Sequence, residues 1–119
     1  MSPWTALKAS ATGLLARLPG EASAKWPQGE RFARAFAHGT MSVELYAPVG
    51  DDPQTPHAQD ELYFIHSGSG DFVLEGERHA FGPGTAFFVP AGAVHRFENF
   101  TPDFATWVVF WGPDGGERP

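Results

Sequence analysis

The sequence contains no cysteine in its 119 residues. Disulfide bonds, thiolate metal ligands and a cysteine nucleophile are therefore all excluded. Basic residues are also few, with eight Lys and Arg against fourteen Asp and Glu and a formal net charge of -6. Because no basic cluster interrupts this acidic balance, we do not expect nucleic acids or anionic membrane surfaces as partners.

Long apolar runs are missing as well. No segment is apolar for long enough to cross a bilayer, and residues 1–20 lack the continuous apolar stretch of a secretory signal. The absence of disulfides fits a reducing compartment. We therefore predict a cytoplasmic protein with no membrane partner.

Aromatic residues are abundant. They make up 14% of the chain, with eleven Phe, and 42% of all residues are hydrophobic. A chain of this length and composition can bury one substantial core but not two. We therefore predict a single main domain.

Residues 1–22 have the pattern of one amphipathic helix. Ser2 and Pro3 are typical of a helix start, and Pro19 followed by Gly20 is typical of a helix end. Between them, the apolar residues that recur mostly at steps of three and four are Trp4, Leu7, Ala11, Leu14, Leu15 and Leu18. We expect this apolar face to pack on the domain that follows or on a partner subunit.

Residues 23–119 have an extended pattern and form the predicted main domain. Short apolar and aromatic stretches alternate with turns rich in Gly and Pro. The predicted strands are residues 31–37, 41–47, 61–67, 71–75, 78–81, 85–89, 95–100 and 104–111. Many short strands separated by such turns indicate an antiparallel barrel or sandwich.

The stretch from Gly84 to Asn99 has unusually regular spacing. Five residues separate Gly84 from Pro90, and one residue separates Pro90 from Gly92. Two residues then precede His95, and three more precede Asn99. A turn built on Pro and Gly fixes one backbone angle and frees another, so it can aim the next side chain reproducibly. His95 is therefore a candidate metal ligand.

This spacing resembles the second motif of the cupin superfamily at every fixed position. A partial match to the first cupin motif lies upstream, where three residues separate His57 from Glu61 and six separate Glu61 from Gly68. The other histidine of that motif would fall at Thr55, and its leading glycine at Gly50, displaced by one position. The chain thus resembles a small single-domain cupin of the conserved-barrel type with one histidine replaced.

The resemblance implies both a fold and a metal site. The implied fold is an all-β, antiparallel double-stranded β-helix, the jelly-roll or cupin barrel, here with one N-terminal helix. The implied site holds one divalent metal inside the barrel through His57, Glu61 and His95. Two imidazoles and one carboxylate suit Fe(II), Mn(II), Ni(II), Co(II) or Zn(II), and three protein ligands leave positions open for water or substrate.

Two further side chains of the first motif are candidates for additional ligands or for contacts to the ligands. Residues two apart in an extended segment share a face, so Thr55 and Gln59 could point into the barrel beside His57. An alternative register takes His57 as the first ligand and Gln59 as the second. Only the first register keeps both the spacing before Glu61 and the spacing before Gly68.

Strand parity extends the candidate site. If Glu61 points inward, so does Tyr63, and if His95 points inward, so does Phe97. Tyr63 could offer its hydroxyl to a bound ligand and Phe97 could form a wall, or both could belong to the ordinary barrel core. The histidines expected on the outside are His38, His66 and His79.

Three functions remain open at this point. The first is a metal-dependent enzyme, a dioxygenase, isomerase or lyase acting on a small organic substrate. The second is a non-catalytic module that binds or senses a small-molecule ligand, and the third is a structural barrel that no longer holds metal. By analogy with small cupins we also expect a homodimer that pairs through residues 31–47.

Overall fold

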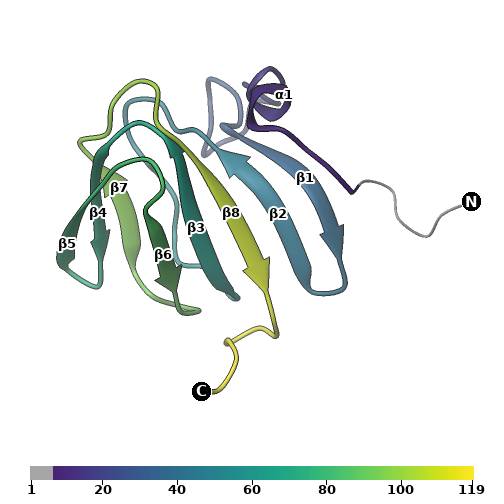
Figure 1. The fold of residues 1–119 in the computed structure, drawn as a ribbon, viewed down its shortest axis with the longest axis vertical. Coiled ribbons are helices and arrows are strands. Elements are labelled where there is room, and N and C mark those ends of the chain that lie inside the picture. Colours follow the sequence, from purple (N-terminus) through teal and green to yellow (C-terminus); the bar gives the residue numbers. More distant parts are fainter. Residues whose placement is uncertain (1–6) are drawn as a thin grey trace, which may run out of the picture.

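The structure, a computed structural model, describes residues 7–119 (Figure 1). The only helix within these residues is α1 (Ala11–Leu15). The strands, in chain order, are β1 (Phe32–His38), β2 (Met41–Tyr46), β3 (Asp60–Ser67), β4 (Gly70–Leu74), β5 (Glu77–Phe81), β6 (Ala86–Val89), β7 (His95–Glu98) and β8 (Ala105–Trp111). Every strand that the sequence predicts is present, and each boundary lies within two residues of its predicted place.

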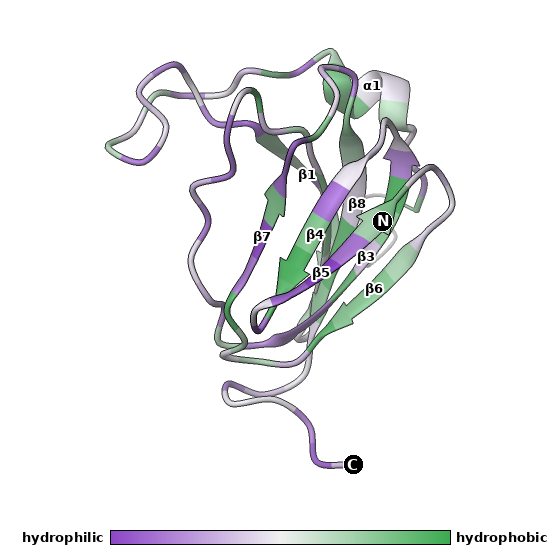
Figure 2. Ribbon diagram, turned by 90° about the vertical axis from the view of Figure 1, so that its left-hand side faces the viewer, coloured by the Kyte–Doolittle hydropathy of each residue, from purple (hydrophilic) through white to green (hydrophobic). Residues whose placement is uncertain are grey.

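The strands form two antiparallel sheets that face each other. One sheet has five strands in the order β1-β2-β8-β3-β6, and the other has three in the order β5-β4-β7. Figure 2 shows the three-stranded sheet in front of the five-stranded one. The predicted all-β, antiparallel jelly-roll fold is confirmed.

Aromatic side chains fill the space between the sheets. Tyr63 from β3, Phe72 from β4 and Phe97 from β7 are at most 1% exposed. The ring centroid of Phe97 lies 4.9 Å from that of Tyr63 and 4.6 Å from that of Phe72. Such ring pairs contribute about 0.5–1.5 kcal/mol each beyond the area that they bury. Packing of these aromatic rings thus joins the two sheets.

The alternation of side chains along β3 decides what enters the interior. Glu61, Tyr63 and Ile65 are buried, whereas Phe64 and His66 are exposed. This is the period of two that a strand imposes on its side chains. A carboxylate therefore enters an otherwise apolar interior.

The N-terminal helix is much shorter than the helix predicted over residues 1–22, and that prediction was wrong in extent. Its expected start at Ser2 and Pro3 lies outside the described residues. The described helix begins only after Ser10, whose backbone is extended, with φ -114° and ψ 149°. The Ser10 hydroxyl accepts a hydrogen bond from the Gly13 N–H, as an N-cap does. The apolar spacing continues on both sides of Ser10, so spacing alone does not reveal that the helix begins there.

Helix α1 covers part of the outer face of the five-stranded sheet. Ala11 and Leu14 pack with Ala33 of β1 and Leu45 of β2 in a second apolar cluster, separate from the aromatic core.

No described helix has the length and apolarity that a membrane crossing requires. Strands β1 and β6 form the two edges of this sheet. Pairing of two chains through the β1–β2 hairpin stays a prediction.

Truncation of Phe97 tests whether this ring belongs to the core or to a pocket wall. Phe97 is 1% exposed and contacts rings from both sheets, so we expect Phe97→Ala to lower the free energy of unfolding by about 3–5 kcal/mol. Urea unfolding followed by circular dichroism measures the change. The control is Phe88→Ala, because Phe88 is 54% exposed and should cost under about 1 kcal/mol. Equal losses in the two variants would contradict this assignment.

Candidate metal centre

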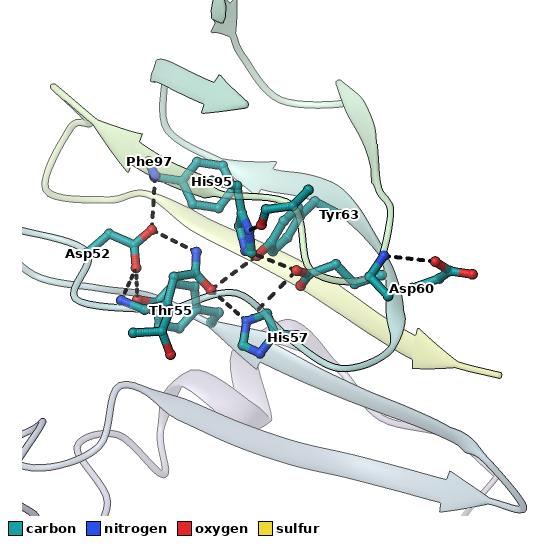
Figure 3. Close-up of polar contacts among 12 residues, drawn as sticks. Asp52, Thr55, His57, Asp60, Tyr63, His95 and Phe97 are labelled. Atoms are coloured by element: carbon teal, nitrogen blue, oxygen red, sulfur yellow. Dashed lines mark hydrogen bonds and ion pairs between the residues drawn. The ribbon is translucent and has the colours of Figure 1, made fainter. Parts of the chain in front are cut away.

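The three predicted metal ligands meet inside the barrel, and Figure 3 labels two of them, His57 and His95. His57 lies in the loop before β3, Glu61 is the second residue of β3, and His95 is the first residue of β7. One ligand atom from each lies within 4.8 Å of the other two. Because β3 and β7 belong to different sheets, the group joins the two halves of the jelly roll. It is the only such group of three among residues 7–119.

Direct contacts between the two sequence motifs place these side chains. The Gly92 N–H, in the turn before β7, donates to the His57 carbonyl oxygen at 2.8 Å. Gly92 has a φ of 80°, in the left-handed region that favours glycine. The buried Asp60 carboxylate accepts the Ala91 N–H of the same turn at 2.9 Å. The turn that presents His95 is therefore held by the backbone of His57 and by Asp60, the residue directly before Glu61.

The glycine that ends the first motif has a steric reason. Gly68 has a φ of 81°, and a Cβ atom added there would lie 2.6 Å from the Cα atom of Phe104. Only glycine fits such a close backbone approach. The spacing from Glu61 to Gly68 is thus the length of β3 between its buried carboxylate and the turn that leaves the strand.

Glu61 faces both histidines. Its Oε1 atom lies 2.9 Å from His95 Nε2 and 3.8 Å from His57 Nε2. The side chains of Glu61 and His95 are 1% and 0% exposed, whereas that of His57 is 32% exposed. Both carboxylate oxygens and His95 Nε2 lack a hydrogen-bond partner among the described residues. Buried polar atoms are rarely left without one, because their desolvation is then uncompensated.

The backbone sets the tautomer of His95. Its Nδ1 atom lies 2.9 Å from the carbonyl oxygen of Ala93. A carbonyl oxygen only accepts, so Nδ1 carries the proton and Nε2 of the neutral ring presents a lone pair. A proton on Nε2 makes this contact an ion pair, but in the neutral ring the lone pair faces the Glu61 carboxylate at 2.9 Å and the two acceptors repel each other. A cation between them converts the repulsion into attraction.

The two imidazoles differ in their tendency to ionise. Burial lowers the pKa of His57, and the charges of His95 and Lys25 lower it further against the opposing effect of Glu61. Burial also acts to lower the pKa of His95, but the Glu61 carboxylate and the Ala93 carbonyl outweigh it and raise the pKa above 6.5. His57 is therefore neutral and free to coordinate, and the position of His95 favours a positive charge beside Glu61.

The two candidates for a further ligand have partners elsewhere. Thr55 is exposed, and its hydroxyl oxygen accepts a hydrogen bond from Lys25 Nζ at 3.4 Å. The Gln59 amide donates to the carbonyl oxygens of Thr40 at 3.0 Å and Gly112 at 2.9 Å. The alternative register, with Gln59 as a ligand, has no support in this arrangement.

The residue that the sequence analysis missed is Gln54. Its Oε1 atom lies 3.2 Å from His57 Nε2 and accepts a hydrogen bond from the Tyr63 hydroxyl at 3.2 Å. Gln54 lies one position before Thr55, in a Pro-rich loop with no strand periodicity, so side-chain direction there could not be read from spacing. No signal in the sequence distinguishes it from Gln59.

The buried carboxylate of Asp52 holds this loop against the barrel. It is 2% exposed and accepts hydrogen bonds from the Tyr46 hydroxyl of β2 and the Phe97 N–H of β7. It also accepts both the backbone N–H and the side-chain amide of Gln54, the latter at 2.7 Å. Asp52 thus fastens the segment before His57 to strands of both sheets.

Tyr63 and Phe97 both point inward, as strand parity predicts. Tyr63 is fully buried, and its hydroxyl lies beside the candidate ligands His57, Glu61 and His95, called the metal group below. Phe97 packs in the aromatic core. Burial, and then the charges of Glu61 and Asp52, raise the pKa of the Tyr63 hydroxyl well above 10. The remaining histidines, His38, His66 and His79, are exposed as expected.

A cavity of about 240 Å³ opens beside the metal group. Its lining residues are Lys25, Trp26, Phe32, Glu44, Tyr46, Gln54, His57, Val108 and Phe110. The walls are largely aromatic, with Lys25 as the one cation. Burial raises the pKa of Glu44 on the wall, although Arg34 opposes this. A small molecule in this cavity would reach the metal group from the side of His57.

A model of the cupin domain matches residues 42–111. This match covers more than half of the chain, which therefore belongs to the cupin family. The family predicted from the two sequence motifs is confirmed, and both motifs lie within the matched residues.

Two curated relatives share part of the sequence. An uncharacterized protein of Streptomyces coelicolor is 42% identical over 76 residues, which cover 62% of this chain and 72% of that protein. The dimethylsulfoniopropionate lyase DddQ of Ruegeria pomeroyi is 31% identical over 80 residues, which cover 65% of this chain and 40% of the lyase. The chain therefore matches less than half of the lyase.

Solved structures share the fold. A Cupin 2 conserved barrel domain protein from Salinispora arenicola has a TM-score of 0.58 and 22% identity, covering 68% of this chain and 74% of its own. KdgF from a Halomonas species also has a TM-score of 0.58 and 22% identity, covering 70% of this chain and 80% of its own. At these identities the likeness shows the jelly-roll fold alone.

Removal of the Asp52 carboxylate tests whether it holds the loop. Asp52→Ala leaves the buried Tyr46 hydroxyl and the Phe97 N–H without their acceptor, so we expect a loss of at least about 2 kcal/mol in the free energy of unfolding. Urea unfolding measures the loss. The neighbouring exposed acid provides a matched control, because Asp51→Ala should change stability by under about 0.5 kcal/mol. A mild effect at position 52 would show that these hydrogen bonds contribute little.

Proposed function

We propose that this protein binds one divalent transition metal through His57, Glu61 and His95 and acts on a small organic molecule in the adjacent cavity. One observation carries the metal proposal. With the imidazole neutral, the Glu61 carboxylate and the His95 Nε2 lone pair repel each other at 2.9 Å in the buried interior, and none of these atoms has another hydrogen-bond partner among the described residues. A bound cation removes this repulsion and satisfies all three atoms.

The donor set fits a transition metal. Two imidazoles and one carboxylate are ligands for iron, manganese, nickel, cobalt or zinc, and their small number leaves room for substrate. When bound, such an ion supplies Lewis-acid polarisation of a substrate oxygen, and redox chemistry if it is iron. The Ala93 carbonyl fixes the ring of His95, so one ligand is oriented before any ion arrives.

Residues around the cavity favour a small ligand that carries a carboxylate. Lys25 lies close enough to His57 to lower the pKa of that imidazole, which places a cation near the metal group. The aromatic walls from Trp26 and Phe110 would receive an apolar or cationic part of the same molecule. Tyr63 keeps its proton because burial raises the pKa of its hydroxyl, so it can act as a hydrogen-bond donor.

We propose lyase chemistry as the reaction class. The support is the identity of 31% to the dimethylsulfoniopropionate lyase DddQ, together with a cavity that pairs a cation with aromatic walls. The alternative is a cupin that binds such a molecule without converting it. Both functions need the same metal and the same cavity, so turnover separates them.

Metal analysis tests the centre itself. We expect about one equivalent of a divalent metal per chain after loading and desalting. His57→Ala and His95→Ala should each lower the retained metal at least tenfold, because each removes one of three ligands. Chelation of the metal from the parent protein should also lower its melting temperature, since the ion binds only the folded state.

The control for these variants is His66→Ala, which removes an exposed histidine from the strand that carries Glu61. It should retain the full equivalent of metal. A parent protein that retains no metal under any loading condition would rule out the proposed function.

An assay with dimethylsulfoniopropionate tests the reaction class. The metal-loaded protein should release a product that requires the metal, and His95→Ala should abolish the release. We expect Lys25→Gln to raise the KM several-fold with a smaller change in kcat, because the lysine charge attracts the carboxylate before the reaction. Gas chromatography and NMR of the mixture follow substrate and product.

The matched control is Lys8→Gln, since Lys8 is exposed and does not line the cavity. It should leave both kinetic constants unchanged. A saturable thermal shift with dimethylsulfoniopropionate but no product would instead support the non-catalytic binding function. If the protein shows neither a thermal shift nor a product, dimethylsulfoniopropionate is not its ligand.

A further inference from the structure

We propose that the Gln54 side chain supplies a fourth metal ligand through its Oε1 atom, in place of the histidine that the first cupin motif would put at position 55. This inference rests on the metal site proposed above. Thr55 itself is exposed and hydrogen-bonded to Lys25, so it cannot fill that role from its observed position. Gln54 is the neighbouring residue whose polar end reaches the group.

The orientation of the Gln54 amide follows from its partners. Its Nε2 atom lies 2.7 Å from Asp52 Oδ2, which also accepts the Phe97 N–H at 2.9 Å. A carboxylate that already accepts a backbone N–H accepts rather than donates, so the NH2 end of the amide must face Asp52. The carbonyl end must therefore face His57 and Tyr63. The lone pairs of Oε1 are thus directed at the metal group by a buried carboxylate.

The distances suit a shared ion. Two atoms that bind one ion at about 2.1 Å lie about 3.0 Å apart at a right angle and about 3.4 Å apart in a tetrahedron. Gln54 Oε1 lies 3.2 Å from His57 Nε2, and Glu61 Oε1 lies 2.9 Å from His95 Nε2. Both pairs therefore have the separation of neighbouring ligands.

The contact between Gln54 and His57 has the same character as that between Glu61 and His95. If His57 Nε2 binds the ion, it presents a lone pair, and the amide oxygen facing it presents another. Without an ion, His57 Nε2 can carry the proton and donate it to Oε1 at 3.2 Å; with Nε2 as the ligand atom, the two lone pairs lie side by side and an ion between them offsets their repulsion. An amide oxygen has two lone pairs, so Oε1 can accept the Tyr63 hydrogen bond and still coordinate.

The test measures Co(II) binding by Gln54→Ala and Gln54→Glu. We expect Gln54→Ala to raise the dissociation constant of Co(II) at least about tenfold, measured by competition with a chelator. Its visible Co(II) spectrum should change as well, because the coordination number falls. Gln54→Glu keeps an oxygen donor but sets a carboxylate against Asp52 in place of the amide N–H, so its Co(II) spectrum should stay closer to that of the parent than the spectrum of Gln54→Ala, even where the affinity falls.

The matched control is Gln59→Ala, which removes the same kind of side chain from the same segment. Its amide contacts the carbonyl oxygens of Thr40 and Gly112, so its Co(II) affinity and spectrum should equal those of the parent. Thr55→Ala should do the same. Circular dichroism confirms that each variant is folded before metal is added.

Each outcome decides the inference. Parent-like affinity and spectrum in Gln54→Ala would overturn the ligand role while leaving the three-residue site intact. A loss of affinity in Gln54→Glu equal to that in Gln54→Ala, with no spectral change in either, would show that Gln54 only positions the loop. A parent protein that binds no Co(II) would overturn both this inference and the proposed function.

Discussion

The Glu61 carboxylate and the His95 imidazole approach to 2.9 Å in the interior of the barrel. The two groups come from different sheets and meet in a core built largely of aromatic rings. Burying an ionised carboxylate without a partner costs several kcal/mol. Ring packing between the sheets holds the pair together despite this cost. If the proposed cation binds, the aromatic core serves as a preformed frame for it, and the ion would in turn stabilise the contact between the sheets.

A second buried carboxylate has the opposite character. Asp52 is satisfied by donors from β2, β7 and its own loop, so it needs no cation and serves as a structural anchor. The buried carboxylates of Glu61 and Asp52 therefore have different roles. Glu61 faces two imidazoles and has no backbone donor among the described residues, whereas Asp52 accepts hydrogen bonds from backbone N–H groups, an amide and a hydroxyl. The distribution of donors, rather than burial, separates a ligand from an anchor.

Sequence patterns predicted most of the fold, because strand periodicity and turn residues are local properties. The turn around Gly92 and the parity of β3 both follow from neighbouring residues, so the inward direction of Glu61, Tyr63 and His95 could be predicted. Helix α1 was overestimated, because apolar spacing says nothing about the cap at Ser10. The role of Gln54 could not be predicted either. Its amide is oriented by a hydrogen bond to Asp52, and loop residues have no period from which direction can be inferred.

If the proposed amide ligand takes the place of a histidine, the exchange bears on what the centre can do. An amide oxygen is a weaker ligand than an imidazole for the borderline metals that suit this donor set. Gln54 and His57 are also the two members of the group that line the cavity, whereas Glu61 and His95 are enclosed. A substrate oxygen entering from the cavity would therefore meet the weakest protein ligand first. With an ion bound as proposed, Gln54 could leave it without disturbing the Glu61–His95 pair, because its amide would stay hydrogen-bonded to Asp52. The altered first motif is thus consistent with a centre that keeps its metal and exchanges one ligand for substrate.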